Sequence, residues 1–257
     1  MRILFIRHGD PDYEHDTLTE KGRREAQCLA AQAPYMEMGD CYVSPLGRAR
    51  DTAAYSLKAL GKTAGTFDWL QEFPARLDLN EIPELTAAYP TSRKKDGKYL
   101  SRIIWDIVPS YLSEHEEYLD SRLWRDTFIC RQSDAVRLYD NVAQNFDRLL
   151  AEYGYVRDGR CYRVEKEYTG TVTFFCHFGI TCVLLSHLWN ISPFVLWHST
   201  ILAPTSVTEI ITEEREKGIA YFRAQRLGDV SHLRMAGEEP AFAGRFCEVW
   251  SDSEHRH

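Results

Sequence analysis

The chain has 257 residues, of which 44% are hydrophobic and 27% are charged, and its formal net charge is −7. This composition is typical of a folded globular protein and argues against a disordered chain. The acidic balance also argues against a nucleic-acid partner, because binding to a phosphate backbone requires a broad basic surface. A small anionic substrate is still compatible, since a few converging arginines create a local positive potential in an acidic protein.

Two features bear on location. No apolar run approaches the length of a bilayer span, and the stretch before Arg7 is too short for a signal peptide. The seven cysteines are odd in number and scattered without paired spacing, and several lie inside apolar runs, where a reduced cysteine behaves as a small hydrophobe. We therefore expect a cytoplasmic protein without a membrane partner.

Strand and helix patterns alternate at the start of the chain. Residues 2–6 predict a short, buried central strand rich in β-branched and aromatic side chains. A helix is expected from about Thr19 to Ala33, either capped by Thr19 or started by a capping box of Thr17 and Glu20.

The same alternation continues in the next segment. Cys41-Tyr42-Val43 predicts a second strand, and the apolar residues from Leu46 to Leu60 are spaced for a helix that begins just after Pro45. This order of elements favours a sheet with helices on both faces.

The middle of the chain differs. Residues 73–131 contain several prolines, a basic stretch and aromatic residues without a clear period. We expect an insertion with short helices that packs near the site and is not a domain of its own. Later elements are predicted as a long helix from about Ser133 to Leu150, a strand over Thr171–Cys176, a helix over 179–189, and a hairpin or edge pair of Val207–Thr212 and Ala220–Arg226.

Together these elements predict the α/β class. We expect a three-layer sandwich whose central, mainly parallel sheet is flanked by helices, with the helical insertion over the carboxyl edge of the strands. The expected domain organisation is one domain over residues 1–250, with the insertion at about 73–131, followed by a polar tail at 251–257.

Polar residues follow the predicted strands where each strand ends. Arg7-His8-Gly9 follows the first strand, Arg48 lies in the segment after the second, and His177-Phe178-Gly179 follows the strand over 171–176. Because the carboxyl ends of parallel strands meet at one edge of a sheet, we expect these side chains to lie together.

These residue types suit phosphoryl transfer. The neutral imidazole of His8 can attack phosphorus and form a phosphoenzyme. The guanidinium groups of Arg7 and Arg48 match phosphate oxygens in two-point contacts and do not compete for the proton. His177 is expected opposite His8 as a further donor to the transferred group.

Three more residues complete the predicted site. Gly9 suggests a turn where backbone approaches the ligand closely, and Phe178 is expected beside the substrate. Glu72 is flanked by apolar residues that would raise its pKa and keep it protonated to donate to the leaving alcohol. Singly, each histidine also fits a structural role, Arg48 a surface charge and Glu72 a solvated loop, so the prediction depends on the combination.

Several segments together resemble the histidine phosphatase superfamily, which also contains the cofactor-dependent phosphoglycerate mutases. The matching segments are the RHG triplet at 7–9, Leu18–Gly22 with Gln27, Ser44–Ala53, Leu70–Glu72, His177–Gly179 and His232-Leu233. The resemblance runs from residue 1 to about 233 and leaves the insertion unmatched.

The resemblance implies a mixed sheet flanked by helices and a reaction without a metal or organic cofactor. It implies His8 as the phosphorylated nucleophile and Glu72 as the proton donor. It also implies that Arg7, Arg48 and His177 surround the phosphate.

Departures from the mutase pattern favour a metal-independent phosphatase acting on a small phosphate monoester. Glu14 stands where that pattern carries an asparagine, and Phe73-Pro74 follows Glu72 in place of an arginine-rich stretch. Phosphoglycerate-mutase-type phosphotransfer and a non-catalytic phospho-ligand binder are the alternatives. The two histidines and Glu72 argue against the binder, because binding alone needs no nucleophile. The sequence specifies neither the substrate nor the oligomeric state.

Other signals are assigned ordinary roles. The basic stretch from Arg93 to Arg102 is interpreted as a solvated loop more readily than as a lid over the site. His177, His187 and His198 lack the close spacing of a zinc site. Five further residues are predicted to be buried in the hydrophobic core. They are the aromatic residues Trp105, Tyr111, Tyr118 and Trp124 of the insertion and Cys176 of the strand over 171–176.

Overall fold

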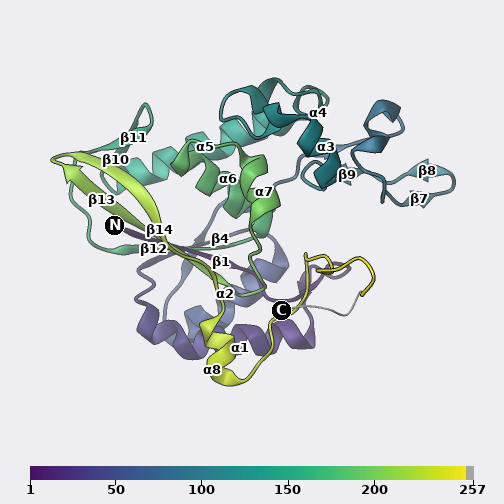
Figure 1. Cartoon of the computed structure of the whole chain (residues 1–257). Coiled ribbons are helices and arrows are strands. Elements are labelled where there is room, and N and C mark those ends of the chain that lie inside the picture. Colours follow the sequence, from purple (N-terminus) through teal and green to yellow (C-terminus); the bar gives the residue numbers. More distant parts are fainter. Residues whose placement is uncertain (253–257) are drawn as a thin grey trace.

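The computed structural model describes residues 1–252, and within that range eight strands form a central mixed sheet (Figure 1). Its strands, in spatial order, are β10 (Tyr155–Asp158), β11 (Cys161–Val164), β14 (Ile219–Asp229), β13 (Val207–Glu216), β1 (Arg2–Arg7), β12 (Thr171–Cys176), β4 (Asp40–Val43) and β5 (Ala64–Thr66). Strand β1 pairs in parallel with β12, β12 with β4, and β4 with β5. The other pairs, β1 with β13, β13 with β14, β14 with β11 and β11 with β10, are antiparallel.

In the parallel half of the sheet, the carboxyl ends of neighbouring strands are in register. Arg7 of β1 is paired with Cys176 of β12, and Phe175 of β12 with Val43 of β4. The residues that follow these strands therefore share one edge. Strands β1 and β12 are buried almost throughout, as expected for a parallel strand covered on both faces.

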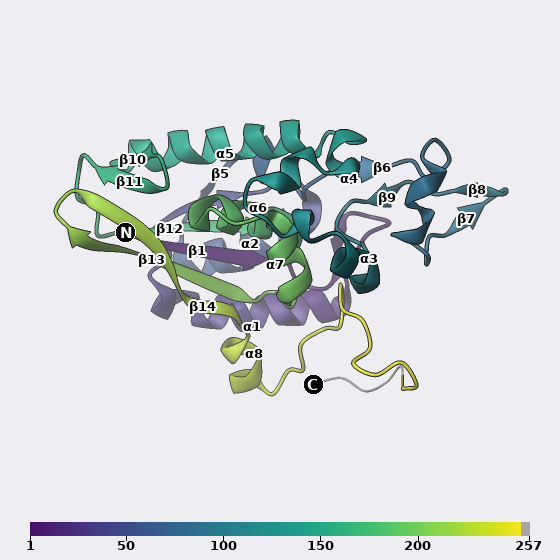
Figure 2. The ribbon, with the colours of Figure 1, turned by 45° about the horizontal axis from the view of Figure 1, so that its top comes forward.

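Helices cover both faces of this sheet (Figures 1 and 2). One face carries α1 (Glu20–Met36), α2 (Gly47–Leu60) and α8 (Ser231–Ala236), and the other carries α5 (Ala135–Glu152), α6 (Phe178–Trp189) and α7 (Pro193–Ser199). The predicted α/β sandwich is confirmed, but the sheet expected to be mainly parallel is mixed, with three parallel and four antiparallel pairs among its eight strands in residues 1–252. Thr19 is the cap of α1, because its hydroxyl accepts a hydrogen bond from the Gly22 N–H at 3.0 Å.

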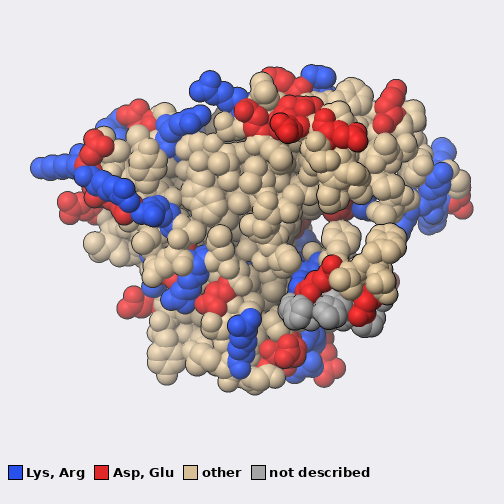
Figure 3. Space-filling model, in the orientation of Figure 1, with Lys and Arg blue, Asp and Glu red and all other residues tan. Residues whose placement is uncertain are grey.

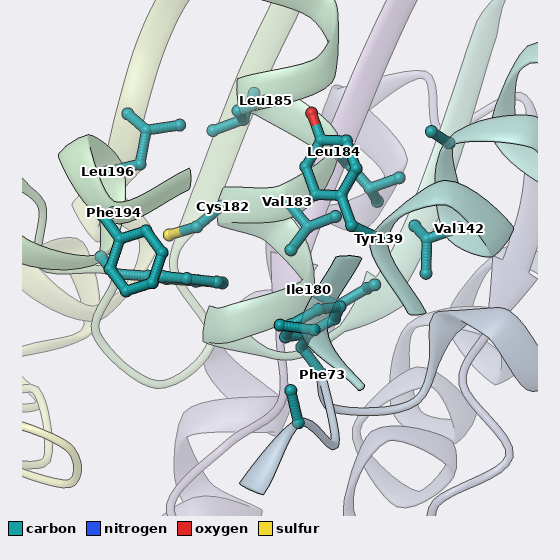
Figure 4. Packing of buried hydrophobic residues seen from close by; sticks show 14 of the residues in the cluster. Phe73, Tyr139, Val142, Ile180, Cys182, Val183, Leu184, Leu185, Phe194 and Leu196 are labelled. Atoms are coloured by element: carbon teal, nitrogen blue, oxygen red, sulfur yellow. The ribbon is translucent and has the colours of Figure 1, made fainter. Parts of the chain in front are cut away.

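Two hydrophobic clusters fill the layers. The smaller joins β1 and β4 to α1 and α2 through residues such as Ile6, Val43 and Leu29. The larger lies on the opposite face and packs α5, α6 and α7 against β12 (Figure 4). Figure 4 shows Ile180 and Val183 of α6 next to the insertion's Phe73.

The insertion lies beyond the carboxyl ends of the parallel strands (Figure 2). Its buried side chains, including Leu85, Tyr89, Ile104 and Trp124, join the larger cluster. Its elements are short: β6 (Arg76–Leu77), η2 (Pro83–Ala87), β7 (Lys94–Lys95), β8 (Lys98–Tyr99), β9 (Arg102–Ile103), α3 (Pro109–Glu114), η3 (Glu116–Tyr118), η4 (Leu123–Asp126) and α4 (Phe128–Arg131).

The basic stretch forms a hairpin of β7 and β8 that projects from this region (Figure 2). Lys94, Lys95 and Lys98 are exposed, and Figure 3 shows lysine and arginine gathered where the hairpin lies. This arrangement favours the solvated loop over a closed lid.

The remaining strands outside the main sheet are β2 (Pro11–Asp12) and β3 (Thr17–Leu18), which pair with each other near the start of α1. A short 3-10 helix, η1 (Asp68–Leu70), follows β5. The predicted late pair is the long hairpin of β13 and β14. It lies inside the sheet, because β14 also pairs with β11. All seven cysteines are free thiols.

The end of the chain is only partly described. Of the polar tail expected at 251–257, residues 253–257 lie outside the described residues. Among residues 1–252, no helix combines the length and the apolar character needed to cross a membrane.

Candidate active site

The two predicted histidines lie side by side at the carboxyl edge of the sheet, with their ring planes tilted by 58°. His8 follows β1 and His177 follows β12, and their ring centroids are 5.0 Å apart. The rings are almost fully buried, with 2% of His8 and none of His177 exposed. The backbone N–H of His8 donates to the Cys176 carbonyl at 3.0 Å, so the parallel pairing continues into the site.

The hydrogen bonds of His8 select one tautomer. Its Nδ1 lies 2.7 Å from the Gly9 carbonyl oxygen, which can only accept, so Nδ1 carries the hydrogen and Nε2 keeps its lone pair. Burial, reinforced by the positive charges of Arg7 and Arg48, holds the pKa of His8 well below its ordinary value. The ring is therefore a neutral imidazole with a free basic nitrogen at physiological pH.

His177 is similarly neutral but differently held. Burial, with His8 and the two arginines adding to the effect, places its pKa well below the ordinary value. Its Nε2 shares a 2.7 Å hydrogen bond with the Ser44 hydroxyl. Ser44 directly follows β4, so three neighbouring parallel strands each deliver a polar side chain to this point.

Arg7 is buried beside the histidine pair. Its Nη1 donates to the carbonyls of Leu202, at 2.5 Å, and Ala243, at 3.2 Å. A Cβ atom on Gly244 would lie 3.1 Å from Nη2 of Arg7, so the segment near the C-terminus passes directly over this guanidinium. Burial lowers the pKa of Arg7, but a guanidinium keeps its charge at neutral pH.

Arg48 enters from the first turn of α2. Its Nη1 makes a 2.6 Å ion pair with Asp16, whose second carboxylate oxygen accepts from the Gly47 N–H at 2.7 Å. A Cβ atom on Gly47 would lie 2.0 Å from the Asp16 carbonyl, so only glycine fits this approach. The Tyr13 ring lies 5.4 Å from the guanidinium carbon. Arg48 is thus a fixed, buried cation, whereas its neighbour Arg50 is exposed.

Glu72 follows β5 and η1 and reaches the start of α6. Its Oε1 accepts from the backbone N–H groups of Phe73, at 3.0 Å, and Ile180, at 3.1 Å. Burial raises its pKa, opposed by these two hydrogen bonds and by Arg7 and Arg48. The carboxyl is held at the positive end of the helix that begins next to His177.

Trp105 of the insertion and this carboxyl both lie next to Gly179. A Cβ atom on Gly179 would meet the Trp105 ring at 2.5 Å and Oε1 of Glu72 at 2.7 Å, so both touch the same point of α6. The Trp105 ring also packs on Trp197, with 5.3 Å between centroids. The core prediction is right for Tyr118 and Trp124, which are buried, but incomplete for Trp105, because it is half-buried at the site.

Three buried nitrogens in this cluster lack a partner among residues 1–252. They are Nε of Arg7, Nε of Arg48 and Nδ1 of His177. A buried polar nitrogen without a hydrogen bond is costly, so a cluster of them indicates a place for a ligand. Cationic donors around a neutral nucleophile suit an anion such as a phosphate group.

The other predicted residues have structural surroundings. Gly9 is required by helix packing, because a Cβ atom there would lie 2.7 Å from the Gly22 carbonyl of α1. Its backbone angle φ is not positive, and its predicted close approach to a ligand stays a prediction. Phe178 is half-buried and packs against the larger cluster. Cys176 is fully buried, and burial raises the pKa of its thiol to about 12, which agrees with a core role.

Several supporting residues were not predicted from the sequence. Asp16, which holds Arg48, lies in a loop with a left-handed backbone angle and offered no motif. Glu25 of α1 accepts from the N–H groups of Asp10, at 2.8 Å, and Ala241, at 2.7 Å, and so ties the C-terminal segment to the site. Within residues 1–252 there is no group of three or more metal-ligating side chains placed to hold an ion.

Comparison with known families agrees with this geometry. The model of the histidine phosphatase superfamily (branch 1) matches residues 3–98. This part includes His8, Arg48 and Glu72 and ends within the basic hairpin.

Solved structures share the fold over most of the chain. A phosphoserine phosphatase mutant from Entamoeba histolytica, in complex with phosphoserine, has a TM-score of 0.56 and 16% identity over 90% of this chain and 98% of its own. A mycobacterial glucosyl-3-phosphoglycerate phosphatase complexed with VO3 has a TM-score of 0.52 and 17% identity over 88% and 98%. The alpha-ribazole phosphatase from Shigella flexneri has a TM-score of 0.51 and 17% identity over 90% and 97%. No curated protein matches the sequence.

Proposed function

We propose that this protein is a phosphatase that hydrolyses a small phosphate monoester through a phosphohistidine on His8. The observation that carries the proposal is the free Nε2 of a buried, neutral His8 that lies next to His177 and is acted on by two buried arginines, each with an unpartnered Nε. A binding site for phosphate alone would not require this nucleophile.

In the first step, Nε2 of His8 attacks the phosphorus atom and forms a nitrogen–phosphorus bond. The ester oxygen–phosphorus bond breaks, and the leaving oxygen takes the proton of Glu72. Arg7, Arg48 and His177 donate to the remaining phosphoryl oxygens, where charge is concentrated in the transition state. The raised pKa of Glu72 supports its role as the acid, because the carboxyl stays protonated to a higher pH than an exposed glutamate.

In the second step, water adds to phosphorus and the nitrogen–phosphorus bond breaks. The Glu72 carboxylate formed in the first step takes the proton of the water, which restores both groups. Inorganic phosphate leaves, and Nε2 of His8 is again a free base.

The similar structures support a phosphomonoester as the substrate class. Their names are phosphoserine phosphatase, glucosyl-3-phosphoglycerate phosphatase and alpha-ribazole phosphatase. At 16–17% identity they support the fold, and the substrate of this chain is left to be found by a screen of phosphorylated metabolites.

His8→Ala is the first test. We expect kcat for an aryl phosphate such as p-nitrophenyl phosphate to fall by at least about 10³-fold, because the covalent route is lost. His115→Ala is a matched control, since this histidine lies in the insertion between Glu117 and Tyr111 and outside the site.

Two outcomes would contradict the proposal. Full activity of His8→Ala would remove the nucleophile. Phosphate exchange on 3-phosphoglycerate with a bisphosphate primer, without release of inorganic phosphate, would make the enzyme a mutase.

A further inference from the structure

A second group of arginines surrounds a cavity on the far side of α6. The cavity has a volume of about 290 Å³ and is lined by Arg122, Arg125, Arg157 and Arg160, together with His187 from the last turn of α6. No carboxylate lines it among the described residues. The cavity is therefore a concentration of positive charge in a protein whose net charge is −7.

One of these four guanidinium groups forms a salt bridge, and the charge of a second, Arg122, acts on the nearby carboxylate of Asp120. Arg125 pairs with Asp140 at 2.8 Å. Within residues 1–252, no salt bridge is formed by Arg122, Arg157 or Arg160. The carboxylate of Asp120, close to Arg122 in sequence, accepts from the backbone N–H groups of Arg122 and Leu123 and holds the local turn.

Arg157 is fixed in place by neutral groups. Its Nη1 donates to the Tyr162 hydroxyl at 3.0 Å and the His187 carbonyl at 3.2 Å, and its Nε donates to the Gly159 carbonyl at 2.9 Å. These bonds orient the guanidinium without neutralising it. The carboxylate of Asp147, which lies behind this group, is bonded by His187 and Tyr162, each at 2.9 Å.

The like charges of the arginines around this cavity repel each other, and an anion between them would relieve that repulsion. We propose that the arginine cavity binds a small anion that carries two phosphate groups. Guanidinium groups match phosphate oxygens in two-point contacts, and four of them around one cavity offer donors for two phosphate groups at once. The cavity volume lies just below the roughly 300–1,000 Å³ typical of small-molecule pockets, which favours a compact ligand.

This cavity is distinct from the candidate active site. His177 caps the first turn of α6 and His187 lies in its last turn, and a helix of 12 residues is about 18 Å long. Binding in the cavity therefore does not depend on the proposed phosphatase activity.

Calorimetric titration of the full chain with methylenediphosphonate tests the proposal. This probe keeps the two phosphonate groups but has a P–C–P link that a phosphatase does not hydrolyse. We expect two binding events in the wild-type protein, one at each site. In the double variant Arg122→Gln, Arg160→Gln, one event should weaken by at least about tenfold, because two charge-assisted contacts are lost.

The control is a second double variant, Arg163→Gln, Arg215→Gln, which removes two exposed arginines that pair with Glu165 and Glu213 away from the cavity. It should retain both events. The side chains of Arg122 and Arg160 are exposed, so the first variant should keep its melting temperature and its aryl phosphatase activity.

Unchanged binding in Arg122→Gln, Arg160→Gln would overturn the proposal. An equal loss in both double variants would also overturn it, because net charge alone would then explain the affinity. A wild-type protein that binds the probe in the cavity but turns over no phosphomonoester would refute the proposed function and leave this site intact.

Discussion

The carboxyl edge of the parallel strands and the insertion beside it position their residues in different ways. At the edge, His8 and His177 follow strands whose register is fixed by backbone pairing. In the insertion, strands such as β6 and β9 are two residues long, and Trp105 is held near Glu72 by packing against Trp197. The sheet thus sets the groups proposed for chemistry, while the insertion sets the environment of the leaving group.

Glu72→Gln tests the acid at the boundary between the two regions. For an alkyl phosphate, whose alkoxide needs a proton, kcat/KM, which reports the first step and not the hydrolysis of the phosphoenzyme shared by both substrates, should fall by about 10²–10⁴-fold. For p-nitrophenyl phosphate the fall should be much smaller, since nitrophenolate leaves without protonation. Steady-state kinetics with both substrates checks this, with Glu81→Gln in an exposed position as control. Equal losses on the two substrates would count against a proton donor.

Arg48→Gln tests whether the edge supplies charge to the transition state. We expect a loss of kcat/KM of about 10²–10³-fold, the usual effect of removing one preorganised donor. Arg50→Gln removes the same charge two residues later, from an exposed position, and should leave kcat/KM nearly unchanged. If the two variants lost activity equally, Arg48 would contribute only to the overall electrostatic potential of the protein and not through a contact with the phosphoryl group.

Trp105→Leu tests the contribution of the insertion. Burial raises the pKa of Glu72, and the indole edge is part of what excludes water from this carboxyl. In the variant the pKa should fall towards its ordinary value, so the acid loses its proton at a lower pH. The alkaline limb of kcat against pH should then move to lower pH, with a loss at neutral pH of about tenfold or less. If the alkaline limb of the kcat profile stayed at the same pH, Trp105 would contribute to packing alone.

Removing the basic hairpin should have the smallest effect. Lys94, Lys95 and Lys98 are exposed, so the triple alanine variant should keep kcat/KM within about twofold for a small monoester. A tenfold rise in KM would show instead that the hairpin closes over the substrate.

The predictable parts of the site are those where local pattern and sheet topology agree. The strand exits at His8, Ser44 and His177 follow from apolar runs that end in polar residues, and the parallel register brings them together. The cap at Thr19 and the buried character of Cys176 also follow from local sequence.

The parts that were not predicted depend on contacts between distant segments. Asp16 reaches Arg48 from a loop, and the Ala243 carbonyl reaches Arg7 from the other end of the chain. Neither contact has a periodic signal in the sequence. The expectation of one domain over residues 1–250 stays a prediction, as do the cytoplasmic location and the roles assigned to the site residues.

The most direct test is to trap the phosphoenzyme. The protein would be mixed with a labelled aryl phosphate, quenched in alkali, digested and mapped by mass spectrometry. The account predicts an acid-labile phosphate on Nε2 of His8 that is absent from His8→Ala. Continued turnover with no label on His8, or with the label on another residue, would contradict it.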